Sequence, residues 1–111
     1  MKIQGEKIMA TIKNISAEEF DAAVAQGTVL ADFWATWCSS CKMLGTVLEQ
    51  AAKEIPDSVT IVKIDVDNAR ELAAKLGVGT LPTLILYKDG AQVRTLTGMQ
   101  SRGKLVELLK A

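Results

Sequence analysis

The sequence contains no histidine, so imidazole is excluded as a general base or metal ligand anywhere in its 111 residues. It contains only two cysteines, Cys38 and Cys41, and a disulfide between them would close a loop too short to add much stability through chain entropy. The hydrophobic fraction, 49%, is enough for a core that needs no covalent support. We therefore expect the two cysteines to serve chemistry rather than stability.

An excess of one charge and a long apolar run are also missing. The chain has 13 basic and 13 acidic residues, and this balance provides no electrostatic attraction toward nucleic acid or an anionic membrane. No apolar run approaches the roughly 20 residues that span a bilayer, and residues 1–7 lack the apolar centre of a secretory leader. We expect a cytoplasmic monomer with no nucleic-acid or membrane partner.

The length is typical of one domain. Residues 1–8 are polar, and Met9 is an alternative start, so we predict that 1–8 form a flexible N-terminal extension and that 9–111 form a single domain. Hydrophobic patterning predicts strands over about 10–13, 28–34, 59–66, 83–87 and 92–96, and helices over about 16–25, 38–54, 69–76 and 101–109. This alternation predicts an α/β fold, in which a mixed central sheet of about five strands has helices on both faces.

Local motifs mark the ends of several elements. Ser16 with Glu19 forms a capping box, and Asn68 with Glu71 repeats the pattern before the third helix. Asp89-Gly90 is typical of a two-residue hairpin turn. Helical spacing assigns these residues to the buried face of the long helix: Met43, Leu44, Val47, Leu48, Ala51, Ala52 and Ile55.

The two cysteines occupy a position that favours redox chemistry. They follow the apolar run of residues 28–34 and open the predicted long helix. The unpaired N–H groups and the dipole at a helix start favour negative charge, and hence the thiolate form that attacks disulfides. The alternatives are an ordinary buried thiol pair and half of a metal site, which would need a second chain to supply four ligands.

Several segments together resemble the thioredoxin family, over nearly the whole chain from about residue 8. The matching segments are Asp32-Phe33-Trp34-Ala35-Thr36-Trp37-Cys38, Cys41-Lys42, Lys63-Ile64-Asp65-Val66-Asp67, Leu81-Pro82-Thr83, Lys88-Asp89-Gly90 and Gly98. A Cys-x-x-Cys pair alone is weakly specific, but its combination with these segments and with the order of elements is strong. The resemblance implies a thioredoxin-like fold.

The resemblance also implies a protein-disulfide oxidoreductase that acts as an electron donor and needs no bound cofactor or metal. Cys38 would attack a client disulfide, and Cys41 would resolve the mixed disulfide and release the reduced client. A flavin-dependent thioredoxin reductase would recycle the protein, and its clients would be disulfide-containing proteins. The alternatives are a binding module that carries a metal or cluster on the cysteine pair, and an oxidase or isomerase outside the cytosol.

Asp32 and Lys63 are the charged residues expected to assist. Burial would raise the pKa of Asp32, and the carboxylate could then take the proton of Cys41, although the strand pattern equally allows an Asp that faces solvent. In the thioredoxin family the matching carboxyl is buried beneath the active site, and the resemblance implies that Lys63 pairs with it and tunes it. The alternative for Lys63 is a surface lysine with a buried stem.

The resemblance implies an apolar rim around Cys38 that docks extended client segments, formed by Trp37, Leu81, Pro82 and Gly98. The family's matching proline is cis and faces the disulfide, which would present the backbone of Leu81 to a client strand. The alternatives are a trans proline that starts a strand and a glycine that only turns the chain. Trp34 is either core or a support of the active site.

The chain departs from the family at two positions. Most members carry Gly-Pro between the cysteines, whereas this chain carries Ser39-Ser40. Family potentials range from about −270 to about −120 mV, and loss of the rigid proline is expected to shift this protein toward oxidising values. Thr46 stands where the family usually has a proline that kinks the long helix, so we expect a straighter helix, bent by less than about 20°.

Overall fold

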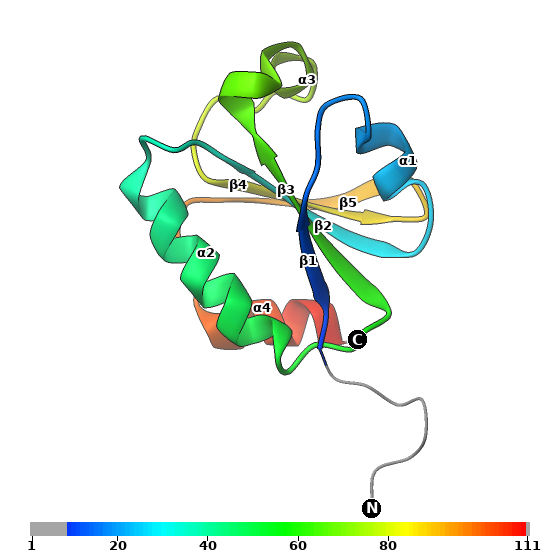
Figure 1. Cartoon of the computed structure of the whole chain (residues 1–111). Helices are drawn as coiled ribbons and strands as arrows, with labels where there is room; N and C mark the ends of the chain where they lie inside the picture. Colours follow the sequence, from blue (N-terminus) through cyan, green and yellow to red (C-terminus); the bar gives the residue numbers. More distant parts are fainter. Residues whose placement is uncertain (1–8, 111) are drawn as a thin grey trace, which may run out of the picture.

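The computed structural model describes residues 9–110 (Figure 1). The elements along the chain are β1 (Thr11–Asn14), α1 (Phe20–Val24), β2 (Thr28–Trp34), α2 (Ser39–Ala52), β3 (Val59–Asp65), η1 (Val66–Asn68), α3 (Arg70–Lys75), β4 (Thr83–Lys88), β5 (Ala91–Thr97) and α4 (Arg102–Lys110). The order of strands and α-helices is the predicted one. The predicted extension, residues 1–8, lies outside the described residues.

Within residues 9–110, five strands form one mixed sheet in the order β1-β3-β2-β4-β5. The strand β3 is parallel to β1 and β2, whereas β4 is antiparallel to β2 and β5. The central strand β2 has five consecutive buried residues, as expected for a strand covered on both faces. The predicted α/β fold with a mixed sheet of about five strands is confirmed.

Helices cover both faces of the sheet (Figure 1). On one face, α2 and α4 bury Leu44 and Leu105 in a cluster with Leu30 of the sheet. On the other face, Phe20 of α1 contacts Phe33 of β2, with ring centroids 5.9 Å apart. The apolar run of β2 therefore supplies side chains to two cores at once.

The alternation of side chains along β2 decides which face Asp32 occupies. Successive residues of a strand point to opposite faces, so Asp32 points to the same face as Leu30. That face is the one covered by α2, the helix that begins directly after the first cysteine. Lys63, opposite Asp32 in the parallel register, points to the same face.

The hairpin between β4 and β5 turns at Asp89-Gly90, as predicted. Both residues have positive φ, 51° for Asp89 and 88° for Gly90, which a two-residue turn of this hand requires. Asp89 Oδ1 accepts a 2.8 Å hydrogen bond from the N–H of Gly27, which ties the hairpin to the start of β2.

Two predictions about helix starts were wrong. The helix predicted from Ser16 begins at Phe20, because the N–H of Glu19 and that of Phe20 donate to carbonyls three residues back and tighten the chain into turns. The Ser16–Glu19 capping bonds nevertheless form. Asn68 does not cap α3, whose N-cap is Ala69 without a side-chain bond. Instead Asp65 caps η1, because the chain passes through this short 3₁₀ turn first.

Met43 was also wrongly placed in the core. Its side chain is 60% exposed, whereas its neighbour Leu44 is fully buried. The helix α2 presents a narrow stripe to the sheet, and Met43 lies beside that stripe rather than on it. Two boundaries shifted as well, since α2 ends at Ala52 and Val66 belongs to η1.

Candidate active site

Cys38 and Cys41 form a disulfide at the start of α2, with their Cα atoms 5.3 Å apart. Cys38 is the N-cap residue of the helix and has an extended backbone. Cys41, one turn further in, is 2% exposed, whereas Cys38 is 9% exposed. The pair packs against partly buried side chains from three other segments, Trp34, Val66 and Leu81. Cys38 therefore carries the more exposed sulfur of a pair that packs against apolar side chains.

Two groups of the described chain lie within hydrogen-bonding distance of the Cys38 sulfur. The N–H of Cys41 donates to Cys38 Sγ at 3.2 Å, which is the N-cap bond of a helix made to sulfur. Ser40 Oγ lies 3.4 Å from the same sulfur. Because the first turn of α2 also presents its unpaired N–H groups here, negative charge on Cys38 is favoured once the disulfide is reduced.

Asp32 is fully buried on β2, on the face of the sheet that α2 covers. Neither of its carboxylate oxygens has a hydrogen-bond partner among the described residues. Burial raises the pKa of Asp32 from 3.8 to about 7, and the positive charge of Lys63 opposes the rise only in part. A carboxyl with this pKa exchanges its proton near neutral pH.

Lys63 lies directly opposite Asp32 in the β2–β3 register. Its Nζ is 4.9 Å from the centroid of the Trp34 ring, an arrangement in which the ring stabilises the cation. It also approaches α2 closely, because a Cβ on Gly45 would lie 3.4 Å from Nζ. The ion pairs found within residues 9–110 do not include one between Lys63 and Asp32. The lysine thus acts on the carboxyl through its charge rather than through direct contact.

The residues expected to surround Cys38 come from separate segments of the chain. Trp37 precedes Cys38 and is 68% exposed, and Leu81 packs against the disulfide. The Leu81–Pro82 peptide is cis, as the resemblance implied. The N–H of Gly98 donates to the carbonyl of Pro82 at 2.9 Å, which ties the start of the β5–α4 connection to the cis peptide.

Gly98 itself combines two properties. Its φ is +80°, a conformation that glycine adopts without strain, so the glycine does turn the chain. Among the described residues other than its two chain neighbours, none has an atom within 4 Å of the position that a Cβ would take, so the space beside its Cα is open. Gly98 therefore both turns the chain and leaves open space beside its backbone.

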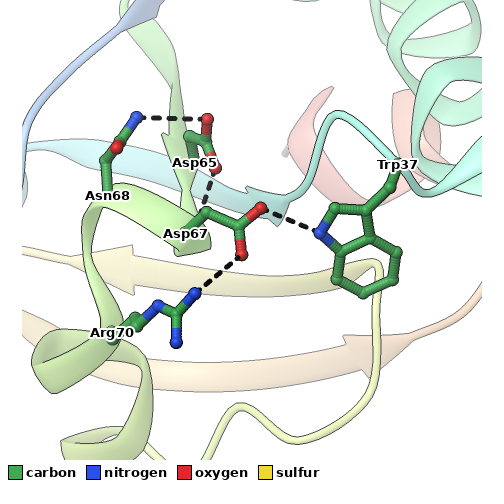
Figure 2. Close-up of polar contacts among 5 residues, drawn as sticks. All are labelled: Trp37, Asp65, Asp67, Asn68 and Arg70. Atoms are coloured by element: carbon green, nitrogen blue, oxygen red, sulfur yellow. Dashed lines mark hydrogen bonds and ion pairs between the residues drawn. The ribbon is translucent and has the colours of Figure 1, made fainter.

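The exposed ring of Trp37 is held by a carboxylate. Its indole N–H donates to Asp67 Oδ2 at 2.8 Å (Figure 2). The N–H of Asp67 donates to Asp65 Oδ1 at 2.9 Å, and its Oδ1 lies 4.0 Å from Nη2 of Arg70. Asp65 Oδ2 also accepts from Nδ2 of Asn68 at 3.3 Å. The residues in and beside η1 thus hold Asp67 in place, and Asp67 orients the Trp37 ring beside Cys38.

Sequence reasoning assigned no role to Asp67. Trp37 and Asp67 are 30 residues apart, and the packing of η1 beside the cysteine loop brings them together. The available indication is the Asp65-Val66-Asp67 pattern at the end of a buried strand, where acidic side chains lie at the rim of the sheet. That pattern does not identify the donor that Asp67 would bind.

The described chain provides no further ligands beside the cysteines. Within residues 9–110, no three His, Cys, Asp or Glu side chains are grouped so that they could hold a metal ion. Two thiolates are half of a tetrahedral zinc site, so the metal-carrying alternative is not favoured.

A separate observation concerns the membrane: none of the helices in this part of the chain has the length and apolar character that crossing a bilayer requires.

Comparison with known proteins agrees with this geometry. The family model named thioredoxin matches residues 11–111. Thioredoxin of Bacillus subtilis is 46% identical over 101 residues, which cover 91% of this chain and 96% of the relative, and thioredoxin of Chlamydia muridarum is 44% identical over 98 residues, which cover 88% and 95%. Among solved structures, Malassezia sympodialis thioredoxin superposes with a TM-score of 0.77 at 34% identity, covering 92% of this chain and 93% of the other. Chloroplastic thioredoxin z superposes with a TM-score of 0.81 at 32% identity, covering 91% and 93%.

A dithiol that closes into a disulfide at a helix N-terminus, in this α/β architecture, defines a thiol–disulfide oxidoreductase. The family match extends over nearly the whole chain, and the chain belongs to the thioredoxin family. The predicted thioredoxin-like fold and the predicted function, reduction of protein disulfides through Cys38 and Cys41, are confirmed. Its substrates are accordingly disulfide-containing proteins, and a reductase supplies the electrons that reduce its disulfide again.

Proposed function

We propose that Cys38 is the nucleophile and Cys41 the resolving cysteine of an electron donor to other proteins. The Cys38 thiolate attacks one sulfur of a client disulfide, a new S–S bond joins Cys38 to the client, and the second client sulfur leaves as a thiolate. Cys41 then attacks Cys38 Sγ, closes the Cys38–Cys41 disulfide and releases the first client sulfur. Two electrons pass to the client. The observation that carries this assignment is the disulfide at the start of α2 with Cys38 as its outer sulfur.

Asp32 is the proposed proton acceptor for Cys41. Cys41 must lose its proton before it attacks, and a carboxyl with a pKa of about 7 can take that proton and release it again. Its strand position directs it toward α2, which carries Cys41. Lys63 is the proposed tuning residue, since its charge counteracts the effect of burial on the pKa of Asp32.

Trp37, Leu81, Pro82 and Gly98 are the proposed client-binding residues. An exposed ring, an apolar side chain on the disulfide and an open glycine together suit an extended apolar segment. Leu81 and Pro82 lie just before β4, where a client backbone can pair with that of Leu81 as an added strand.

The proposed physiological setting is the cytoplasm, with a flavin-dependent thioredoxin reductase as the recycling partner and the protein acting as a monomer. A donor dithiol needs a compartment that keeps thiols reduced, which supports this assignment. Cell fractionation combined with alkylation trapping tests it, because the chain should be found in the cytoplasmic fraction with both cysteines reduced. A mainly oxidised pool outside the cytoplasm would favour the oxidase or isomerase alternative.

Mixed-disulfide trapping tests the roles of the cysteines. Cys41→Ser should accumulate a covalent adduct with a disulfide-containing client such as insulin, because the adduct is formed but not resolved. Cys38→Ser should form almost none, and Ser39→Ala, a change at an exposed neighbour, should behave as the unmodified protein. Adducts that form equally well on Cys38→Ser would reverse the assignment.

The potential of the pair is expected to lie above about −270 mV, the value measured for thioredoxin itself. The proposed reason is that Ser39-Ser40 lacks the rigid proline found between the cysteines of most relatives. Equilibration against defined glutathione buffers measures it. A value at or below that of thioredoxin contradicts the expectation.

A further inference from the structure

The residues between the two cysteines, where the chain departs from the family pattern, place a side-chain hydroxyl beside the reactive sulfur. Ser40 Oγ lies 3.4 Å from Cys38 Sγ, within hydrogen-bonding distance for sulfur. A sulfur in a disulfide carries no hydrogen, so the hydroxyl must be the donor in this contact. Ser40 is half-buried in the first turn of α2, two residues after the N-cap. A proline at this position would have no donor to offer.

We propose that Ser40 is a catalytic residue, whose hydroxyl donates a hydrogen bond to Cys38 Sγ and stabilises the thiolate when Cys38 attacks or leaves. This inference rests on the proposed role of Cys38 as nucleophile. It assigns to one hydroxyl a stabilisation of the Cys38 thiolate that is separate from any effect of losing the rigid proline.

The physical argument is the difference between two acceptors. A disulfide sulfur is a weak, neutral acceptor, whereas a thiolate carries a full negative charge, and hydrogen bonds to charged groups are roughly twice as strong as neutral ones. The Ser40 contact is therefore stronger in the reduced protein than in the oxidised one. Together with the 3.2 Å bond from the N–H of Cys41, it gives the Cys38 thiolate a side-chain and a backbone donor.

The same contact acts at two points of the reaction. When Cys38 attacks a client disulfide, the hydroxyl increases the fraction of Cys38 present as thiolate. When the Cys38–Cys41 disulfide is reduced, a thiolate of the reductant attacks Cys38 Sγ and Cys41 leaves. A second thiolate of the reductant then attacks the sulfur now bonded to Cys38, and Cys38 leaves as a thiolate that accepts from Ser40. Because the hydroxyl stabilises the reduced form more than the oxidised form, it shifts the pair toward oxidising potentials.

Alkylation kinetics on the full chain test the proposal. Ser40→Ala removes the donor with little change in volume, and we expect the thiolate titration of Cys38, followed by its rate of reaction with iodoacetamide against pH, to move to higher pH. At a pH below both transitions, the rate should fall about three- to tenfold, as expected if the hydroxyl stabilises the thiolate more than the neutral thiol by about the net strength of one ordinary hydrogen bond. Ser40→Thr keeps the hydroxyl and should stay close to the unmodified protein, and Ser39→Ala is the matched control.

The equilibrium with glutathione provides the second readout. Well above the thiolate transition, Ser40→Ala should change the equilibrium constant about three- to tenfold in favour of the disulfide form, which corresponds to about 15–30 mV toward more reducing values. Ser40→Pro separates hydroxyl from rigidity, because any change beyond that of Ser40→Ala reports on the proline ring. Equal titrations and potentials for Ser40→Ala and Ser39→Ala would overturn the proposal.

Failure of the proposal is distinguishable from failure of the proposed cysteine roles. Mass spectrometry of the singly alkylated protein identifies which cysteine reacts first. If Cys41 reacted first in the unmodified protein, the nucleophile assignment itself would be wrong. If Cys38 reacts first but Ser40→Ala changes neither its titration nor the potential, the assignment stands and the role of Ser40 is refuted.

Discussion

The buried carboxyl of Asp32 should make the stability of the oxidised protein depend on pH, and Asp32→Asn should remove that dependence. The native side chain is fully buried without a hydrogen-bond partner among the described residues, so its ionised form is disfavoured in the folded state. The amide of the variant has nearly the same shape and does not titrate. The variant therefore isolates the free energy of ionising this one group.

The magnitude follows from the pKa of Asp32, which folding raises from 3.8 to about 7. Between these values the folded state holds the proton and the unfolded state does not, so unfolding releases a proton and stability falls as the pH rises. At about 1.4 kcal/mol for each tenfold change in proton affinity, the stability present at low pH and lost by about pH 7 is about 4 kcal/mol. Above that pH the contribution is constant.

The assay is urea unfolding of the oxidised protein, followed by circular dichroism from pH 5 to pH 9. The intact disulfide keeps the cysteines from titrating. The stability of Asp32→Asn minus that of the unmodified protein should rise by about 3 kcal/mol from pH 5 to about pH 7 and then level off. Asp57→Asn, at an exposed position, is the control and should show a nearly flat difference. A flat difference for Asp32→Asn would refute the claim that its carboxyl is neutral in the folded protein below pH 7.

Further predictions concern the Trp37–Asp67 hydrogen bond, the helix α2 and residues 1–8. Asp67→Ala removes the 2.8 Å hydrogen bond to the indole of Trp37, so KM for a protein disulfide should rise about two- to tenfold with little change in unfolding free energy. An unchanged KM would contradict the role of Asp67 in orienting Trp37. Gly45→Ala should stabilise α2 by up to about 1 kcal/mol in urea unfolding, because the lysine amine 3.4 Å away can shift, and a loss of stability contradicts this. A crystal structure should show α2 bent by less than about 20° at Thr46. Removal of residues 1–8 should leave insulin reduction unchanged if 9–111 are the whole domain, and a loss of activity would show otherwise.

Much of the architecture could be predicted because it rests on local physical rules. The apolar run of residues 28–34 predicts a strand buried on both faces, and β2 has those bounds. The Asp89-Gly90 pair predicts its hairpin because few other dipeptides accept two positive φ angles. The Cys-x-x-Cys spacing at the start of an amphipathic segment predicts a pair that can close across one helical turn, and Cys38 and Cys41 do so.

Local rules were insufficient where a residue's surroundings come from distant parts of the chain. Met43 satisfies the helical spacing of the core, but only the seat of α2 on the sheet decides that it is 60% exposed. The alternatives for Asp32, buried base or solvent-facing acid, could not be separated from the strand pattern, because the pKa of a carboxyl depends on the helix that covers it.

The division between sequence and tertiary structure is therefore physical. The sequence by itself determined the order of the elements, the turns and the two thiols at a helix start, because these depend on neighbours within a few residues. The tertiary structure decided that Asp67 holds Trp37 from 30 residues away, and that Lys63 lies over Trp34 rather than against Asp32. Contacts of this kind form only when strands and helices pack, because burial, charge and hydrogen bonding depend on distances in space rather than on distances along the chain.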